Sequence, residues 1–126
     1  MKSCEGFKFT KEHVWVSADG GKARVGISDY AQKKLKDIVY VDISSSLKEI
    51  SEGKVFASIE SVKNVSEIYA PVSGKVININ TALFKTPELI NQDAYENYLV
   101  EIEVADDSPL AALMSEKEYN EFCEGL

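Results

Sequence analysis

The chain has 126 residues, of which 44% are hydrophobic and 28% charged, which is enough for one globular domain with a single core. Its 14 basic and 21 acidic residues give a net charge of -7, so most of the surface would repel a nucleic-acid backbone. No apolar run approaches the roughly 20 residues that span a bilayer, and the lead-in from Met1 lacks the apolar stretch of a secretory signal, so we expect neither membrane insertion nor export.

The cysteine and histidine content excludes the common metal and nucleophile sites. Cys4 and Cys123 stand near opposite ends of the chain and form no CxxC pair, and His13 is the only histidine. One histidine cannot build a histidine-based metal cluster, and no serine or cysteine nucleophile motif accompanies it. We therefore expect no metal, no catalytic triad and two reduced thiols.

The first predicted elements are a β-hairpin and a short helix. Residues 13–17 and 22–27 have strand-like composition, and the Asp19-Gly20-Gly21 segment between them accepts the positive φ of a tight turn. Asp29 is then placed to cap a helix over residues 30–35, with Gln32 completing a capping box.

Short strands are predicted through the middle of the chain. Runs rich in β-branched and aromatic residues indicate strands over 38–43, 55–60, 65–69, 75–79 and 99–104. Gly74, in one of the intervening turns, is expected to adopt a positive φ. Thr86 before Pro87 predicts the start of a helical turn that runs through Ile90.

The C-terminal segment is predicted to be helical. A turn opens at Ser108-Pro109, and Ser115 with Glu118 forms a capping box for a last helix. The residues that recur there at helical spacing indicate packing against a sheet rather than a ligand site: Tyr119, Phe122 and Cys123. Many short strands with helices near residue 30 and at the C-terminus predict a mainly β fold, a flattened sandwich or barrel. Long crossover helices are missing, so a doubly wound parallel sheet is not expected.

One lysine lies midway between two predicted strands. Residues 59–69 read IESVKNVSEIY, so Lys63 falls at or beside a hairpin tip and its amine points into water. A lysine that acts as a base or forms a Schiff base needs a lowered pKa, whereas the nearby carboxylates of Glu60 and Glu67 favour the ammonium form. Self-activated chemistry is therefore not expected. Exposed lysines are usually inert, but a rigid turn can also present its amine to another enzyme that acylates it.

The pattern of the whole chain resembles the H protein of the glycine cleavage system, a lipoyl carrier. The matching segments cover roughly residues 7 to 123, and the Glu-Ser-Val-Lys run is the most specific among them. They are 9–13 with 15–16, 25–32, 37–41, 60–63, 66–74 and 87–91, followed by Asp93, Tyr95 and the terminal helix.

The resemblance implies a fold and a site. The fold is the barrel-sandwich hybrid of lipoyl domains, in a single carrier domain over residues 1–126 with its core at about 7–123. The site is a lipoyl group joined by an amide to Lys63, in a turn that the lipoylating enzyme recognises through Glu60, Ser61, Val62 and Glu67. No residue of the chain is then catalytic.

The resemblance also implies partners. The carrier takes the aminomethyl group of glycine from the P protein, a glycine decarboxylase, and delivers it to the T protein, an aminomethyltransferase. The L protein, a dihydrolipoamide dehydrogenase, reoxidises the arm, and a lipoate ligase or a lipoyl/octanoyl transferase installs it. We expect a monomer without nucleic-acid or membrane partners, in the bacterial cytoplasm, or in the mitochondrial matrix if the chain is a processed organellar protein.

Some positions depart from the family pattern. Val14 stands where the family often has an acidic residue, and Lys34 stands where some members have a histidine. Ala94 replaces a proline, and the segment that ends at Tyr98 replaces a Gly-x-Gly-Trp-like run. These changes leave open an H-like carrier that relays lipoyl groups to other enzymes or serves a redox or stress pathway. An interaction module with an unmodified Lys63 and an enzyme remain further alternatives, the enzyme being the weakest because no catalytic constellation surrounds His13.

Overall fold

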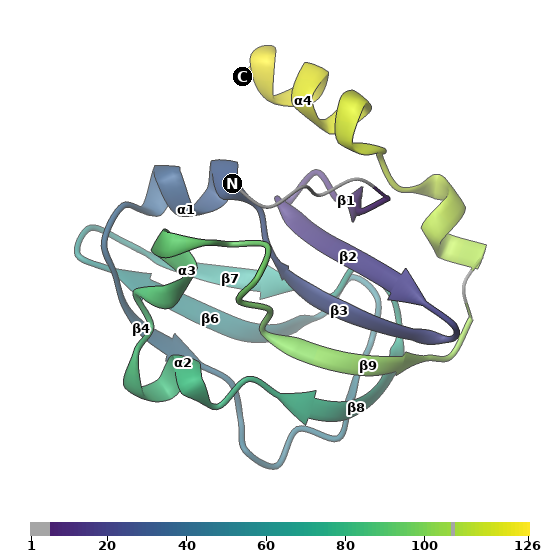
Figure 1. The fold of residues 1–126 in the computed structure, drawn as a ribbon, viewed down its shortest axis with the longest axis horizontal. Coiled ribbons are helices and arrows are strands. Elements are labelled where there is room, and N and C mark those ends of the chain that lie inside the picture. The colour runs from purple at the N-terminus through teal and green to yellow at the C-terminus, as the bar shows by residue number, and fades with distance from the viewer. Residues whose placement is uncertain (1–5, 107) are drawn as a thin grey trace.

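Two antiparallel sheets face each other in a computed structural model that describes residues 6–106 and 108–126 (Figure 1). The larger sheet has the strand order β1-β2-β3-β9-β8-β5 and the smaller sheet the order β4-β6-β7. The strands are β1 (Lys8–Phe9), β2 (Val14–Asp19), β3 (Lys22–Ile27), β4 (Ile38–Asp42), β5 (Glu49–Ile50), β6 (Val55–Ser61), β7 (Val65–Tyr69), β8 (Gly74–Ile79) and β9 (Val100–Val104). This arrangement confirms the predicted mainly β sandwich.

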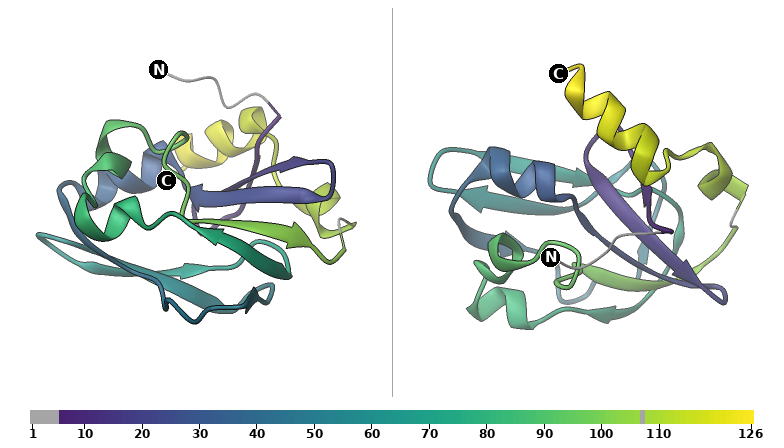
Figure 2. Two further views of the ribbon diagram at one scale, coloured as in Figure 1. Left: turned by 60° about the horizontal axis from the view of Figure 1, so that its bottom comes forward. Right: turned by 45° about the horizontal axis from the view of Figure 1, so that its top comes forward.

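The helices are short and lie at the margins of the sandwich. They are α1 (Asp29–Leu35), α2 (Ala82–Lys85), α3 (Leu89–Gln92), the 3-10 helix η1 (Ser108–Ala112) and α4 (Glu116–Glu124). Figure 2 shows α1, α2 and α3 gathered at one end of the molecule. The last helix, α4, contacts β1, and its Tyr119 hydroxyl lies 2.7 Å from the Ser28 Oγ at the cap of α1. The predicted helix near residue 30 and the C-terminal helix are both present.

The main core fills the space between the two sheets. Alternate residues of each strand point inward, so β2 and β3 contribute Val14, Val16 and Val25, and the smaller sheet contributes Ile59 and Ile68. All of these side chains are buried. The sandwich is therefore held together mainly by burial of aliphatic side chains.

A second, aromatic cluster lies on the opposite face of the larger sheet. The cluster consists of Phe9, Trp15, Tyr95 and Tyr119. Tyr119 belongs to α4, so the cluster packs this helix against the sheet, as the helical spacing predicted. Trp15 packs directly on Gly26, where a Cβ atom would come within 2.7 Å of the indole ring. The Trp15 Nε1–H donates to the carbonyl oxygen of Ala94 at 3.1 Å.

The β2–β3 hairpin and the helix α4 form where the turn and capping residues of the sequence predicted them. Gly20 and Gly21 have φ of 60° and 85° and form the two-residue turn of the predicted β2–β3 hairpin. The Ser115 and Glu118 side chains form the predicted capping box of α4. The sequence did not predict β1 and β5, which have two residues each, or α2. Elements of two to four residues are too short to show a periodic pattern.

Three local predictions were wrong. Ser28, not Asp29, caps α1, because its Oγ accepts the Ala31 N–H at 3.1 Å, and Asp29 is the first helical residue. Gly74 does not have a positive φ, and its lack of a Cβ matters because that atom would lie 2.5 Å from the Glu103 carbonyl oxygen. Thr86 follows α2 as its C-cap, and α3 begins three residues later.

Candidate functional site

Lys63 lies in the turn between β6 and β7, as predicted. The Ser61 N–H donates to the Asn64 carbonyl oxygen at 2.8 Å and closes the turn. The Ser61 Oγ accepts the N–H groups of Lys63 at 3.2 Å and Asn64 at 3.1 Å, and its hydroxyl reaches the Asn64 carbonyl oxygen at 3.2 Å. Because Ser61 is buried, its hydroxyl organises the turn from within. The backbone beneath Lys63 is therefore fixed by several hydrogen bonds.

A further backbone contact fixes the turn to the rest of the fold. The Val62 N–H donates to the carbonyl oxygen of Asp37 at 3.1 Å, immediately before β4. Asn91 of α3 supports the same region, because its side chain accepts the Ile38 N–H at 3.0 Å and donates to the Lys36 carbonyl oxygen at 2.7 Å. The sequence did not single out Asn91, since a side-chain amide that bonds distant backbone leaves no periodic signal.

The charged residues near the turn lie on the outer face of the smaller sheet. Glu60 stands in one cross-strand row with Tyr40 and Val65, and Glu67 pairs with Ser58 in the next outward-facing row. Lys63, Glu60 and Glu67 are all exposed, and within the described part of the chain Lys63 forms no ion pair or side-chain hydrogen bond. The lysine amine is therefore accessible to a second protein, and both carboxylates lie on the hairpin that presents it.

A cavity of about 260 Å³ lies beside this hairpin, between α1, the turn before β2 and the inward face of β7. Ser66 and Ile68 line it from β7, and Ser66 is only three residues beyond Lys63. The remaining lining residues mix polar and apolar side chains: Glu12, His13, Ile27, Tyr30, Ala31, Lys34 and Leu35. The sequence did not indicate this cavity, because its lining comes from segments that are distant in sequence.

His13 is held in the wall of this cavity. Its ring lies 4.7 Å from the Tyr30 ring, and its Nδ1 is 2.6 Å from the Tyr119 hydroxyl. Burial lowers the pKa of His13, and the positive charge of Lys34 acts in the same direction, while the Glu12 carboxylate partly opposes both. Near neutral pH the ring is therefore mostly uncharged.

The positions that depart from the family pattern have ordinary structural surroundings. Val14 is fully buried in the core between the sheets, and Ala94 is buried where its carbonyl accepts the Trp15 N–H. Tyr98 stacks under Arg24, with 4.7 Å from the guanidinium carbon to the ring centroid, and its hydroxyl contacts the Asn78 amide. Of the four positions, only Lys34 lines the cavity beside the Lys63 hairpin.

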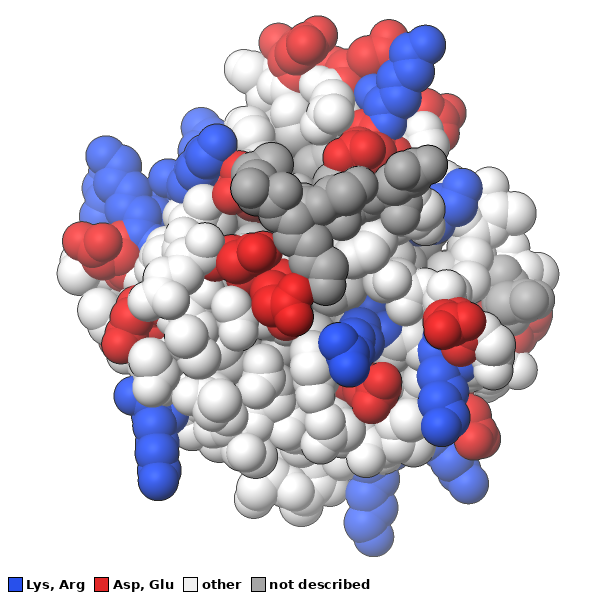
Figure 3. Space-filling view, viewed as in Figure 1, with Lys and Arg blue, Asp and Glu red and all other residues white. Residues whose placement is uncertain are grey.

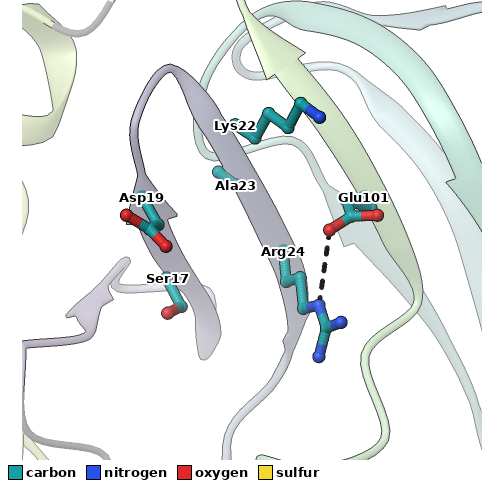
Figure 4. A pocket seen from close by; sticks show the side chains of 6 residues that line it. All are labelled: Ser17, Asp19, Lys22, Ala23, Arg24 and Glu101. Carbon is teal, nitrogen blue, oxygen red and sulfur yellow. Dashed lines mark hydrogen bonds and ion pairs between the residues drawn. The ribbon is translucent and has the colours of Figure 1, made fainter.

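A second hollow, of about 300 Å³, lies on the outer face of the larger sheet (Figure 4). The side chains there carry both signs of charge, and Arg24 pairs with Glu101 at 3.5 Å. Figure 3 shows the same mixing on the face that it presents, with no continuous basic track. In the described residues, no group of three or more histidine, cysteine or acidic side chains is placed to hold a metal ion.

Among the described helices, none is long and apolar enough to cross a membrane. Cys123 is a free, half-buried cysteine, while Cys4 lies outside the described residues.

Comparisons with known proteins identify the family. The family model of the glycine cleavage H-protein matches residues 7–125. A glycine cleavage system H protein of Alkaliphilus oremlandii is 44% identical over 124 residues, 98% of both chains. One from Staphylococcus epidermidis is 47% identical over 116 residues, 91% of this chain and 92% of that one. The crystal structure of an H protein from Mycobacterium marinum superposes with a TM-score of 0.83 at 29% identity, covering 96% of this chain and 98% of that one.

These matches agree with the observed sandwich fold. The chain therefore belongs to the glycine cleavage H-protein family, and it is a non-catalytic, lipoyl-bearing carrier of the aminomethyl group.

Proposed function

We propose that the lipoyl group is attached to Lys63 through an amide bond. The observation that supports this site is an exposed, unpaired lysine on a turn that is fixed by Ser61 and by the Val62–Asp37 backbone bond. In the attachment, the lysine amine attacks an activated acyl carbon, an amide forms, the amine loses a proton and the activating group leaves with its bonding electron pair. A fixed turn lowers the entropy lost when the amine is positioned for this step.

The turn also presents the groups by which the attaching enzyme recognises it. Glu60 and Glu67 offer two exposed carboxylates on one face, and Val62 offers an exposed apolar side chain beside the lysine. Ser61 has a different role from the other three, because it is buried and sets the backbone conformation. We assign direct recognition to Glu60, Val62 and Glu67, and positioning to Ser61.

The cavity beside β7 is the place where the end of the arm would shelter. Ser66 lies three residues beyond Lys63, at most about 10 Å along the chain, so a long acylated lysine can reach it. Tyr30, Leu35 and Ile68 would contact the apolar part of the arm, and the polar groups of Glu12 and Lys34 would face its loaded end. The chemistry that the lipoyl group supplies when bound is a disulfide that can be opened and reformed.

The catalytic steps of the cycle then belong to the partners. We propose that the P protein loads the arm, the T protein unloads it and the L protein restores the disulfide, while this chain provides a fixed attachment point and a docking surface. Tethering raises the effective concentration of the arm at each docked active site. The net charge of -7 would favour partners with basic rims. The bacterial relatives support a cytoplasmic carrier. We expect it to act as a monomer, in one domain over residues 1–126 with its core at about 7–123.

The proposed cargo is tested by isotope exchange. Lipoylated protein is mixed with P protein, glycine and labelled bicarbonate, and incorporation of label into glycine is measured. We expect exchange with the wild-type carrier and none with Lys63→Arg. Absence of exchange with a cognate P protein, despite complete lipoylation, would contradict the aminomethyl role and favour a carrier that relays lipoyl groups.

A further inference from the structure

Four apolar side chains stand exposed around the Lys63 turn, and we refer to them as the collar. They are Val39, Tyr40, Val62 and Val65, whose exposed fractions are 48%, 51%, 64% and 62%. Tyr40 and Val65 lie on either side of Glu60 in one cross-strand row, so this part of the collar spans about 10 Å over three neighbouring strands. This row of the collar therefore runs across the outer face of β4, β6 and β7.

A β-bulge produces part of this surface. The register between β4 and β6 shifts between Ile38 and Tyr40, so that Val39 is the extra residue on β4. Regular alternation would leave only one of two successive residues exposed, but Val39 and Tyr40 are both about half exposed. The neighbouring inward row, Val41 with Ile59, is buried as usual. The bulge thus adds an apolar side chain to the outer face without removing one from the core.

The centre of the collar carries one negative charge. Glu60 is exposed, and within the described part of the chain its carboxylate has no ion pair or side-chain hydrogen bond. Exposed apolar groups around an unpaired carboxylate match the surface of an interface that combines apolar contacts with a specific charge contact. The partner that fits this surface has an apolar rim and a basic side chain opposite Glu60.

The reach of the unmodified lysine decides which partner this is. An extended lysine side chain places its nitrogen only about 6 Å from its Cα atom, so an enzyme that acylates the amine must approach the turn closely. Once the lysine is acylated, the arm extends the reach, and later partners can use it from further away. The acylating enzyme must therefore contact the collar closely, whereas the later partners need not.

We propose that the collar is the docking surface for the enzyme that acylates Lys63. This proposal rests on lipoylation of Lys63 and deepens it, because it assigns Val39, Tyr40 and Val65 to recognition. Hydrophobic contacts with these three side chains would supply binding energy that the short turn alone lacks.

The test compares two variants of the unmodified protein with a lipoate ligase, lipoate and ATP. The collar variant carries Val39→Thr, Tyr40→Thr and Val65→Thr, which place a β-branched, strand-favouring residue at each of the three positions. The control is Ile77→Thr, because Ile77 is 46% exposed on β8, in the other sheet. We expect the KM of the ligase for the collar variant to rise by about tenfold and that of the control to stay unchanged. Thermal unfolding of both variants verifies that they are folded.

A wild-type KM for the folded collar variant would overturn the proposal. The collar variant is also lipoylated to completion with excess ligase and tested in P-protein exchange, where we expect a wild-type rate. A loss of exchange as large as the loss in ligation would overturn the assignment of the collar to the acylating enzyme. Failure of the underlying function gives a different result, because wild-type protein would then gain no lipoyl mass at all.

Discussion

The His13 Nδ1 atom lies 2.6 Å from the Tyr119 hydroxyl, although the two residues are 106 positions apart. The same hydroxyl lies 2.7 Å from the Ser28 Oγ, so one tyrosine of α4 joins the turn before β2 to the cap of α1. Burial raises the pKa of Tyr119, and the phenol stays protonated. This contact closes one wall of the cavity beside the Lys63 hairpin, since His13 lines it.

Removing this hydroxyl should destabilise the protein. We expect Tyr119→Phe to lower the free energy of unfolding by about 1–3 kcal/mol, because the buried partners lose a hydrogen bond. Tyr98→Phe is the matched control, since the Tyr98 hydroxyl contacts Asn78 at the surface, and a change within about 0.5 kcal/mol is expected there. Urea unfolding measures both. Equal effects of the two substitutions would contradict the proposed role of Tyr119.

Stability should depend on pH through His13. Burial lowers the pKa of this histidine in the folded state, so below its ordinary value of 6.5 the unfolded chain binds more protons. Its contribution is therefore fully present above pH 6.5 and is lost as the pH falls toward the lowered folded value. We expect the free energy of unfolding to fall between pH 7.5 and 5.5 more steeply for wild type than for His13→Gln. Parallel pH profiles would show that His13 does not contribute.

Gly74 should resist substitution for a steric reason. An added Cβ would lie 2.5 Å from the Glu103 carbonyl oxygen on the neighbouring strand β9, where neither backbone can move freely. Gly74→Ala is expected to lower the free energy of unfolding by about 1–3 kcal/mol. Gly125→Ala serves as the control, because its nearest contact would be an ordinary 3.5 Å. Similar melting curves for the two variants would contradict the close approach of β8 and β9.

The Ser61 hydroxyl should matter for modification of Lys63. Ser61→Ala removes the acceptor for the N–H groups of Lys63 and Asn64. We expect kcat/KM for lipoylation to fall about fivefold, equivalent to about 1 kcal/mol of lost positioning. The control is Ser44→Ala, whose hydroxyl accepts the Ser46 N–H in a different exposed turn. A wild-type rate for Ser61→Ala, measured on folded protein, would show that the turn needs no such support.

Much of the fold could be predicted because its signals are local. The Gly20-Gly21 turn, the Ser115 capping box and the strands on either side of Lys63 each depend on residues adjacent in sequence. The cavity could not be predicted, since Tyr30 and Ser66 meet there only through the packing of α1 against the smaller sheet. Gly74 was misinterpreted for a similar reason, because the atom that excludes a side chain belongs to Glu103.

Localisation of the lipoyl group by mass spectrometry tests the central claim most directly. Protein produced with lipoate and a lipoate ligase is analysed intact and after proteolysis, together with Lys63→Arg. We expect one lipoyl increment on the intact wild-type protein, located on Lys63 in its peptide, and no increment on the variant. An increment that persists in Lys63→Arg, or that lies on another lysine, would contradict the assignment of Lys63 as the attachment site.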